Sequence, residues 1–133
     1  SREQLQLYLR AKGHDRTILV TDATSAAAAV PGVYGLGPMT LERQQEPVAL
    51  SPDTGRPAGS AVTLDQCLQN VINWFDLSLD DAISWASDNP RKILGNSISE
   101  NDFSDQWINW KKMEGMWKVM EVQTGKFKIQ NYP

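Results

Sequence analysis

The sequence predicts an α/β domain followed by a tail of antiparallel strands. Residues 3–12 have the apolar spacing of a short amphipathic helix, and the uninterrupted apolar run at residues 18–20 follows almost at once. Such a run without alternation is typical of a strand covered on both faces in a parallel sheet. From residue 107 onward, short aromatic and β-branched runs alternate with turn residues, which favours antiparallel strands.

The first helix and the strand after it form half of a βα unit. Gly13 provides a C-cap for the helix, and the strand over about residues 17–21 ends at Asp22. A lone carboxylate at the C-terminal tip of a buried strand is where α/β enzymes place catalytic groups. An aspartate that caps a helix or forms an Asx turn suits the same position, and position alone favours neither interpretation.

The middle of the chain predicts a small antiparallel meander on the surface. The alanine-rich segment after Asp22 is expected to be a weak helix or a loop, which Pro31 and Gly32 end. β-leaning stretches within residues 33–50 are separated by a Gly-Pro pair and a polar run, as in a meander. Residues 51–60 contain two prolines and two glycines and are expected to form a loop.

Two further helices have clear start signals. Thr63 and Gln66 match a capping box, and apolar residues at helical spacing continue to about residue 75. Ser78 opens the next helix, and the Asn-Pro pair at 89–90 is expected to close it, followed by a short turn that ends at Gly95.

Composition excludes several classes of function. The 133 residues include 13 Lys and Arg against 16 Asp and Glu, with no cationic cluster, so no nucleic-acid partner is expected. No apolar stretch approaches the roughly 20 residues of a membrane span, and residues 1–20 lack the charged-then-apolar order expected of a secretory signal. Cys67 is the only cysteine and is expected to be a buried, inert thiol. We therefore expect a cytoplasmic protein with no membrane partner.

The other chemically active side chains are weak candidates. His14 is the only histidine and stands in a polar loop, so a solvated side chain is expected rather than a base or ligand. One His, one Cys and no carboxylate cluster cannot by themselves form a conventional zinc or two-metal site. Ser25 and Ser60 lack a histidine partner in any motif. Gly55 and Gly59 do not match a phosphate-binding spacing, although exposed amides there could hold an anion. The tryptophan-rich tail is more typical of a sheet core than of a ligand-stacking face.

Four segments together resemble a known enzyme family. They are Arg-Ala-Lys-Gly at 10–13, Ile-Leu-Val-Thr-Asp-Ala-Thr-Ser-Ala-Ala at 18–27, Ala-Gly-Ser-Ala-Val-Thr-Leu at 58–64 and Asn-Pro-Arg at 89–91. Each is weak alone, but the combination is similar to the C-terminal third of the N-acetylglucosamine-6-phosphate deacetylases of the amidohydrolase superfamily. The resemblance covers about residues 2–95.

The resemblance implies a (β/α)8 barrel with a small β-sandwich. Residues 1–95 would then be the C-terminal part of the barrel, with its last strand and following helices, and residues 96–133 would be sandwich strands. The family hydrolyses the acetamide of N-acetylglucosamine 6-phosphate to glucosamine 6-phosphate and acetate. It uses a divalent metal, zinc or iron, which lowers the pKa of water and polarises the amide carbonyl.

The resemblance also assigns roles to residues of this chain. Asp22 matches the aspartate at the end of the eighth barrel strand, which takes a proton from the metal-activated water and delivers it to the leaving amine. The family's substrate-contacting loop falls on Pro57, Ala58 and Gly59, with Ser60 beside them. Small residues there would let the backbone approach an amino-sugar phosphate closely.

Departures from the family pattern limit what this chain is expected to do alone. The family's metal ligands and phosphate-binding groups match positions before residue 1, and 133 residues are short for a barrel of about 250. Residues 101–107 also depart from the family's Gly-x-x-Ala-Asp pattern. We therefore expect an inactive C-terminal fragment whose apolar faces are buried by self-association or by the missing N-terminal part. The alternative is an independent non-enzymatic α+β module for binding or assembly.

Overall fold

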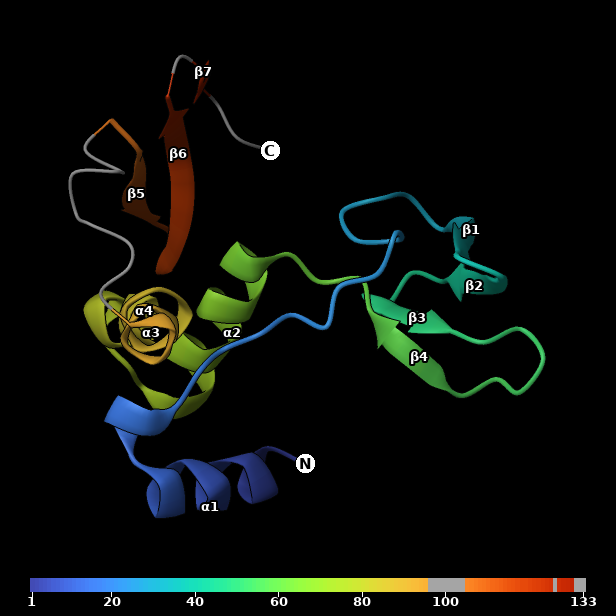
Figure 1. Cartoon of the computed structure of the whole chain (residues 1–133), viewed down its shortest axis with the longest axis horizontal. Helices are drawn as coiled ribbons and strands as arrows, with labels where there is room; N and C mark the ends of the chain where they lie inside the picture. The colour runs from blue at the N-terminus through green and yellow to red at the C-terminus, as the bar shows by residue number, and fades with distance from the viewer. Residues whose placement is uncertain (96–104, 126, 131–133) are drawn as a thin grey trace. The chain divides into compact units, whose positions relative to one another are not determined.

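The computed structural model describes residues 1–95, 105–125 and 127–130, with side chains described up to residue 125. It is an α+β structure with two antiparallel sheets (Figure 1). The chain divides into two compact units, one formed by Ser1–Ile18 and Leu68–Pro133 and the other by Leu19–Cys67. The division falls inside one helix, α2 (Leu64–Phe75).

The first unit contains most of the helices and one sheet. Its elements besides the main part of α2 are α1 (Arg2–Lys12), the 3-10 turn η1 (His14–Arg16), α3 (Leu79–Ala86), α4 (Asp88–Leu94), β5 (Trp107–Met113), β6 (Met116–Thr124) and β7 (Phe127–Gln130). Its buried apolar side chains come mainly from α2 and α3 and are Leu68, Val71, Ala82 and Trp85, with Val119 of β6.

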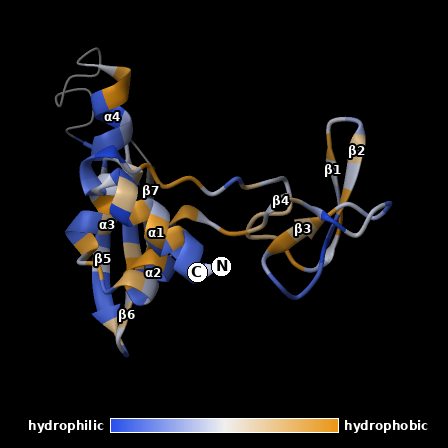
Figure 2. Ribbon diagram, turned by 90° about the horizontal axis from the view of Figure 1, so that it is seen from below, coloured by the Kyte–Doolittle hydropathy of each residue, from blue (hydrophilic) through white to orange (hydrophobic). Residues whose placement is uncertain are grey.

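Helix α1 confirms the expected first helix, but its apolar face is open. Ser1 and Gln4 form a reciprocal capping box at its start, and Gly13, at φ 81°, ends it by donating its N–H to the carbonyl of Leu9 at 2.8 Å. No residue of α1 is buried, and the side chains of Leu7 and Tyr8 are 62% and 70% exposed. Figure 2 shows hydrophobic residues along this helix.

Helices α2 and α3 begin where their capping residues predict. The N–H of Thr63 donates to Oε1 of Gln66 at 3.3 Å, which is one half of the expected capping box. Ser78 caps α3 by accepting the N–H of Asp81 at 3.1 Å.

The expectation that the Asn-Pro pair closes this second helix is wrong. Helix α3 ends at Ala86, and Asn89 and Pro90 lie in the first turn of α4. Proline is tolerated there because the first backbone N–H groups of a helix have no intrahelical acceptor. The buried amide of Asn89 donates Nδ2 hydrogen bonds to the carbonyls of His14 at 2.8 Å and Thr17 at 2.7 Å. Asn89 therefore joins α4 to the segment that leads toward Asp22.

The tail forms the expected antiparallel strands, in the order β5-β6-β7. Its first hairpin turns at Glu114 and Gly115, both with positive φ, between the paired Met113 and Met116. The N–H of Trp117 donates to Oε1 of Gln69, which ties the sheet to α2. The expected departure at residues 101–107 lies mostly outside the described residues.

The second unit contains the predicted meander, enlarged by one strand. Strands β1 (Gly32–Leu36), β2 (Met39–Arg43), β3 (Val48–Leu50) and β4 (Pro57–Ser60) pair antiparallel in that order. Strand β4 occupies the end of the segment expected to be a loop. Small side chains dominate the core of the unit, which consists of Ala26, Leu41, Ala49 and Ala61.

The buried strand expected over residues 17–21 is not formed. These residues have no strand assignment, and the side chain of Val20 is 71% exposed. Among the described residues, the nearest bridge lies just after this segment, between Ala23 and Ser60, and it is parallel. A strand needs a continuous ladder to a neighbour, and one bridge satisfies too few backbone groups to form one.

The compact units do not divide at residue 95, where the resemblance separates barrel from sandwich. The first helix and the tail belong to the same compact unit. The resemblance, in contrast, assigns residues to the barrel and sandwich of a longer protein. The assignment of residues 1–95 and 96–133 to those two parts stays a prediction.

Replacing Asn89 by alanine is expected to lower the free energy of unfolding by about 2–4 kcal/mol, because the buried carbonyl of Thr17 and the partly buried carbonyl of His14 each lose a side-chain donor. Asn73→Ala is the matched control, since Asn73 is exposed in α2 and its loss should cost less than about 0.5 kcal/mol. Urea denaturation followed by circular dichroism measures both. Equal losses for the two variants would contradict the role assigned to Asn89.

Candidate functional site

The two predicted parts of the site lie together in the second unit. The N–H of Ser60 donates to the carbonyl of Asp22 at 2.8 Å, and the N–H of Thr24 donates to the carbonyl of Ser60 at 2.9 Å. This is the bonding of the parallel bridge between Ala23 and Ser60. Backbone hydrogen bonds thus join the candidate carboxylate to the candidate substrate segment, 36 residues apart at Thr24 and Ser60.

Gly59 permits this close approach. It has φ 135°, and a Cβ placed on it would lie 2.5 Å from Cγ2 of Thr24 and 3.2 Å from the carbonyl oxygen of Asp22. Real Cβ atoms essentially never come within 3.0 Å of a heavy atom outside their own residue and its two chain neighbours. Glycine is therefore required both by its backbone conformation and by the lack of space.

Thr24 holds the contact from the other side. Its hydroxyl donates to the carbonyl of Ser60 at 3.1 Å and accepts the N–H of Ala26 at 3.3 Å. One side chain thereby orders the turn after Asp22 and the end of β4. The sequence analysis gave Thr24 no role, although a threonine two residues after a candidate acid is a turn former.

Asp22 has a left-handed backbone and an exposed side chain. Its φ is 53°, a conformation that aspartate tolerates better than most residues. The turn bonds expected of a capping residue come from its neighbours, since Thr21 accepts the N–H of Ala23 and Thr24 accepts that of Ala26. Within the described residues, no hydrogen bond or ion pair occupies the Asp22 carboxylate. It is free to act on another molecule.

Strand β4 is an edge strand, which suits a substrate wall. It pairs with β3 on one side, and on the other its one bridge to a described residue is that to Ala23. Pro57, at the first position of the strand, is exposed, while Ala58, Gly59 and Ser60 are half-buried. Proline fits the start of an edge strand because it has no N–H to donate.

The other sequence candidates have structural roles in this unit. The hydroxyl of Ser25 donates to the carbonyl of Gly35 at 2.6 Å, and that of Ser60 accepts the N–H of Val62 at 2.9 Å. The N–H groups of Thr54 and Gly55 both donate to the carbonyl of Ser51. These amides are therefore not available to an anion.

The described residues do not fit a divalent metal. They contain no group of three or more His, Cys, Asp or Glu side chains that could hold one. His14 is exposed as expected, but its ring also packs against Trp85, with centroids 5.2 Å apart. Cys67 is half-buried, and burial, with a smaller effect of the Asp65 charge, raises the pKa of its thiol, as suits an unreactive cysteine.

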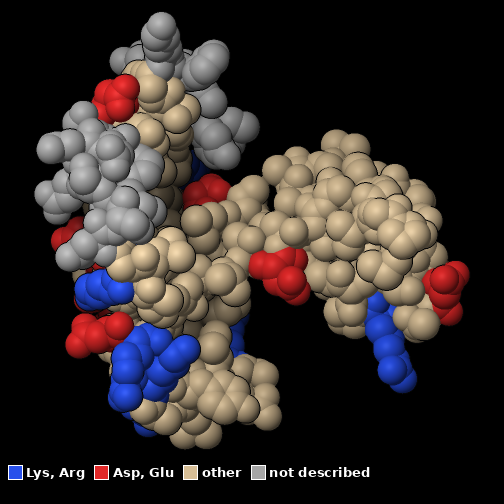
Figure 3. All heavy atoms as spheres, viewed as in Figure 1, with Lys and Arg blue, Asp and Glu red and all other residues tan. Residues whose placement is uncertain are grey.

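Surface charge offers no continuous basic area on the face seen in Figure 3, where Lys and Arg side chains alternate with Asp and Glu over the described part of the first unit. No helix in the described ranges combines the length and apolarity needed to cross a membrane.

No family model matches the chain. Among curated proteins, an N-acetylglucosamine-6-phosphate deacetylase from Lysinibacillus sphaericus is 32% identical over 90 residues, which are 68% of this chain and 23% of that protein. One from Vibrio furnissii is 34% identical over 80 residues, which are 60% of this chain and 20% of that protein.

This chain resembles the N-acetylglucosamine-6-phosphate deacetylases. Solved deacetylase structures agree. An aspartate-to-alanine mutant from Mycobacterium smegmatis, in complex with N-acetyl-D-glucosamine-6-phosphate, matches with a TM-score of 0.62 and 30% identity over 71% of this chain and 26% of its own. The deacetylase from Pasteurella multocida matches 98% of this chain and 34% of its own with a TM-score of 0.78, and at 18% identity it supports the fold alone. The chain spans only 23% and 20% of the two curated deacetylases.

Substituting Gly59 by alanine is expected to break the contact between β4 and Asp22. The added methyl group meets Thr24, and φ 135° is unfavourable for alanine, so the free energy of unfolding should fall by about 2–4 kcal/mol. Hydrogen exchange by NMR should show faster exchange of the Thr24 and Ser60 amides. Gly35→Ala, where no atom lies within 4 Å of the new Cβ, serves as the control.

A double variant tests the steric part of this prediction. Thr24→Ser removes the methyl group that the new Cβ would meet but keeps the hydroxyl, so combining it with Gly59→Ala should restore part of the protection. Unchanged exchange at Ser60 in the Gly59→Ala single variant would refute the assigned role of Gly59.

Proposed function

We propose that this chain is the part of an N-acetylglucosamine-6-phosphate deacetylase that supplies the proton-carrying carboxylate, Asp22, and one wall of the sugar site, β4. One observation carries the proposal. The two segments that the resemblance assigns to catalysis and to substrate binding are joined by backbone hydrogen bonds between Asp22, Thr24 and Ser60.

Amide hydrolysis needs one proton removed from water and one delivered to the leaving nitrogen. A single carboxylate can do both in succession if it is close to both atoms and has no competing partner. Asp22 meets the second condition within the described residues, and its exposed position leaves room for a substrate. The family's divalent metal, zinc or iron, is assigned to no residue of this chain, because the described donor set does not fit it.

An amino-sugar phosphate is the proposed substrate class. The relative from Mycobacterium smegmatis was solved with N-acetyl-D-glucosamine-6-phosphate, and it shares 30% identity with this chain over the matched part. The small residues Ala58 and Gly59 on an edge strand allow a sugar ring to approach the backbone.

In the proposed whole protein, residues 17–21 become the last strand of a (β/α)8 barrel. Their apolar run, which lacks a ladder here, would pair with strands from the rest of a longer chain, and residues 96–133 would join a β-sandwich. The match to the fold of the Pasteurella multocida deacetylase over 98% of this chain supports this arrangement.

A chimera tests the proposed catalytic role. The chain replaces its matched segment in the Lysinibacillus sphaericus deacetylase, and release of acetate from N-acetylglucosamine 6-phosphate is measured. We expect activity in the chimera and a loss of about 10²–10⁴-fold in kcat on Asp22→Asn, because the amide side chain cannot carry the proton. Asp15→Asn, the same change at an exposed acid of η1, should leave kcat unchanged.

The second experiment measures turnover of N-acetylglucosamine 6-phosphate by the isolated 133-residue chain with added zinc. We expect no turnover, since the described donors form no metal site. Ordinary turnover by the isolated chain, or full activity of the Asp22→Asn chimera, would overturn the proposal. A folded chimera without activity would favour the non-enzymatic binding or assembly module.

The proposed partner of the isolated chain is a second copy of itself, in place of the rest of the barrel. The open apolar face of α1, with Leu7 and Tyr8 largely exposed, needs a cover. Sedimentation velocity should show a mean mass that rises with concentration, and the double variant Leu7→Lys, Tyr8→Lys should shift it toward the monomer. Ala11→Lys, at another exposed position of α1, controls for added charge. A monomer at all concentrations would contradict this expectation.

A further inference from the structure

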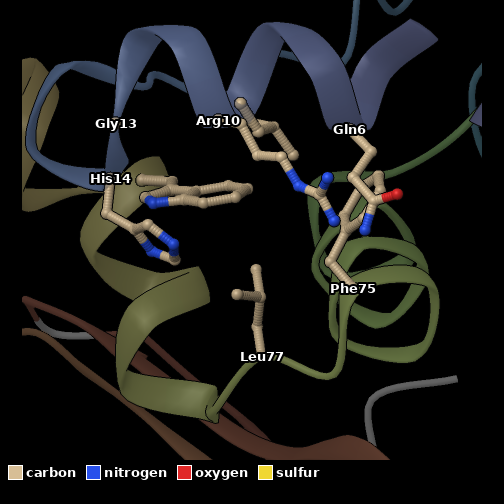
Figure 4. A pocket seen from close by; sticks show the side chains of 8 residues that line it. Gln6, Arg10, Gly13, His14, Phe75 and Leu77 are labelled. Atoms are coloured by element: carbon tan, nitrogen blue, oxygen red, sulfur yellow. The ribbon is translucent and has the colours of Figure 1, made fainter. Parts of the chain in front are cut away.

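A pocket of about 250 Å³ lies within the first unit, between α1, η1, the end of α2 and α3. Figure 4 shows its side chains converging from these elements. Three aromatic rings line it, those of His14, Phe75 and Trp85, together with the aliphatic side chains of Leu9 and Leu77. Apolar and aromatic walls with a few polar groups are the usual lining of a small-molecule site.

The walls of this pocket are held in place. Trp85 is only 2% exposed, and its ring meets that of His14 at a tilt of 59°. The backbone of His14 is fixed by the Nδ2 hydrogen bond of the buried Asn89 at 2.8 Å. On the side formed by Trp85 and His14, a ligand would therefore meet a preformed surface, which lowers the entropy cost of binding.

Two polar side chains from α1, Gln6 and Arg10, line the same pocket (Figure 4). The guanidinium of Arg10 takes part in no ion pair or hydrogen bond with the described residues, whereas Arg16 donates to the carbonyl of Lys12 and Arg43 to that of Ala29. A free guanidinium beside apolar rings is a binding group for a planar anion, because its forked donors match a carboxylate.

We propose that this pocket binds a small carboxylate that carries a single apolar ring. The ring contacts the side chains of Phe75, Leu77 and Trp85, and the carboxylate accepts hydrogen bonds from Arg10 and Gln6. The volume favours a small ligand, because 250 Å³ lies below the roughly 300–1,000 Å³ of sites for drug-sized molecules. This site is independent of the proposed deacetylase function, since none of its residues belongs to the unit that holds Asp22.

Titration of the ¹⁵N-labelled 133-residue chain with benzoate tests the proposal. NMR should show saturable shifts confined to the amides of Gly13, His14 and Leu77 and to the indole N–H of Trp85. Arg10→Gln should weaken the affinity at least tenfold. Arg16→Gln, an exposed arginine outside the lining, should not change it. Cyclohexanecarboxylate should bind at the same resonances, because the proposal requires an apolar ring and not an aromatic one.

Three results would overturn the proposal. The first is that benzylamine binds as tightly as benzoate, because the negative charge of the ligand would then not contribute to affinity. The second is that acetate binds as tightly as benzoate, because the ring of the ligand would then contribute nothing to affinity. The third is the same resonances shifting on dilution of the protein alone, which would show that a second copy fills the pocket. Because Gln6 and Arg10 are exposed side chains of a helix, their variants are expected to fold, and circular dichroism verifies this.

Discussion

The close backbone contact between residues 22–24 and Gly59–Ser60 is the constraint on which the second unit depends. Strand β4 meets the segment after Asp22 through two main-chain hydrogen bonds and the Thr24 hydroxyl, and only a residue without a side chain at position 59 allows that separation. The contact also determines where the Asp22 carbonyl points, because that oxygen accepts the Ser60 N–H. Position and backbone conformation of the candidate acid are therefore consequences of a glycine far away in the sequence.

The first unit depends on a comparable long-range bond. Asn89 reaches from α4 to two carbonyls more than 70 residues earlier, and the same bonds fix the η1 wall of the pocket. Each unit thus combines locally determined helices and hairpins with a few described polar contacts. Within the unit, these contacts set how its helices, turns and strands lie relative to one another. Loss of one such polar side chain affects several helices or strands at once. Loss of a single apolar contact is compensated in part by the other side chains packed around it.

Local signals in the sequence predicted most of the elements. Capping residues such as Ser78 and turn pairs such as Glu114 and Gly115 determine helix starts and hairpins through nearby bonds, so the sequence pattern suffices. The strand over residues 17–21 could not be judged in this way. Its apolar run indicates that the segment prefers a buried environment. Whether a strand forms depends on hydrogen bonds to neighbouring strands, which the local sequence does not specify. The Asn-Pro pair was misread because proline marks a helix start as well as a helix end, and only tertiary bonds decide between the two. For the candidate site, residue types and resemblance predicted both segments, and their functional roles stay a prediction. The contact between them, and the role of Thr24 in it, required coordinates.

The left-handed backbone of Asp22 restricts which residues evolution can place there. Asparagine and glycine tolerate φ near 53° but carry no charge, and glutamate carries the charge but enters this conformation less readily. Aspartate is thus the one acidic residue well suited to this backbone. If the carboxylate acts as proposed, relatives that keep the activity should show no drift to glutamate at this position. Relatives that have lost the activity should accumulate asparagine or glycine there first. The residue at this position should therefore distinguish catalytically active members of the group from inactive ones.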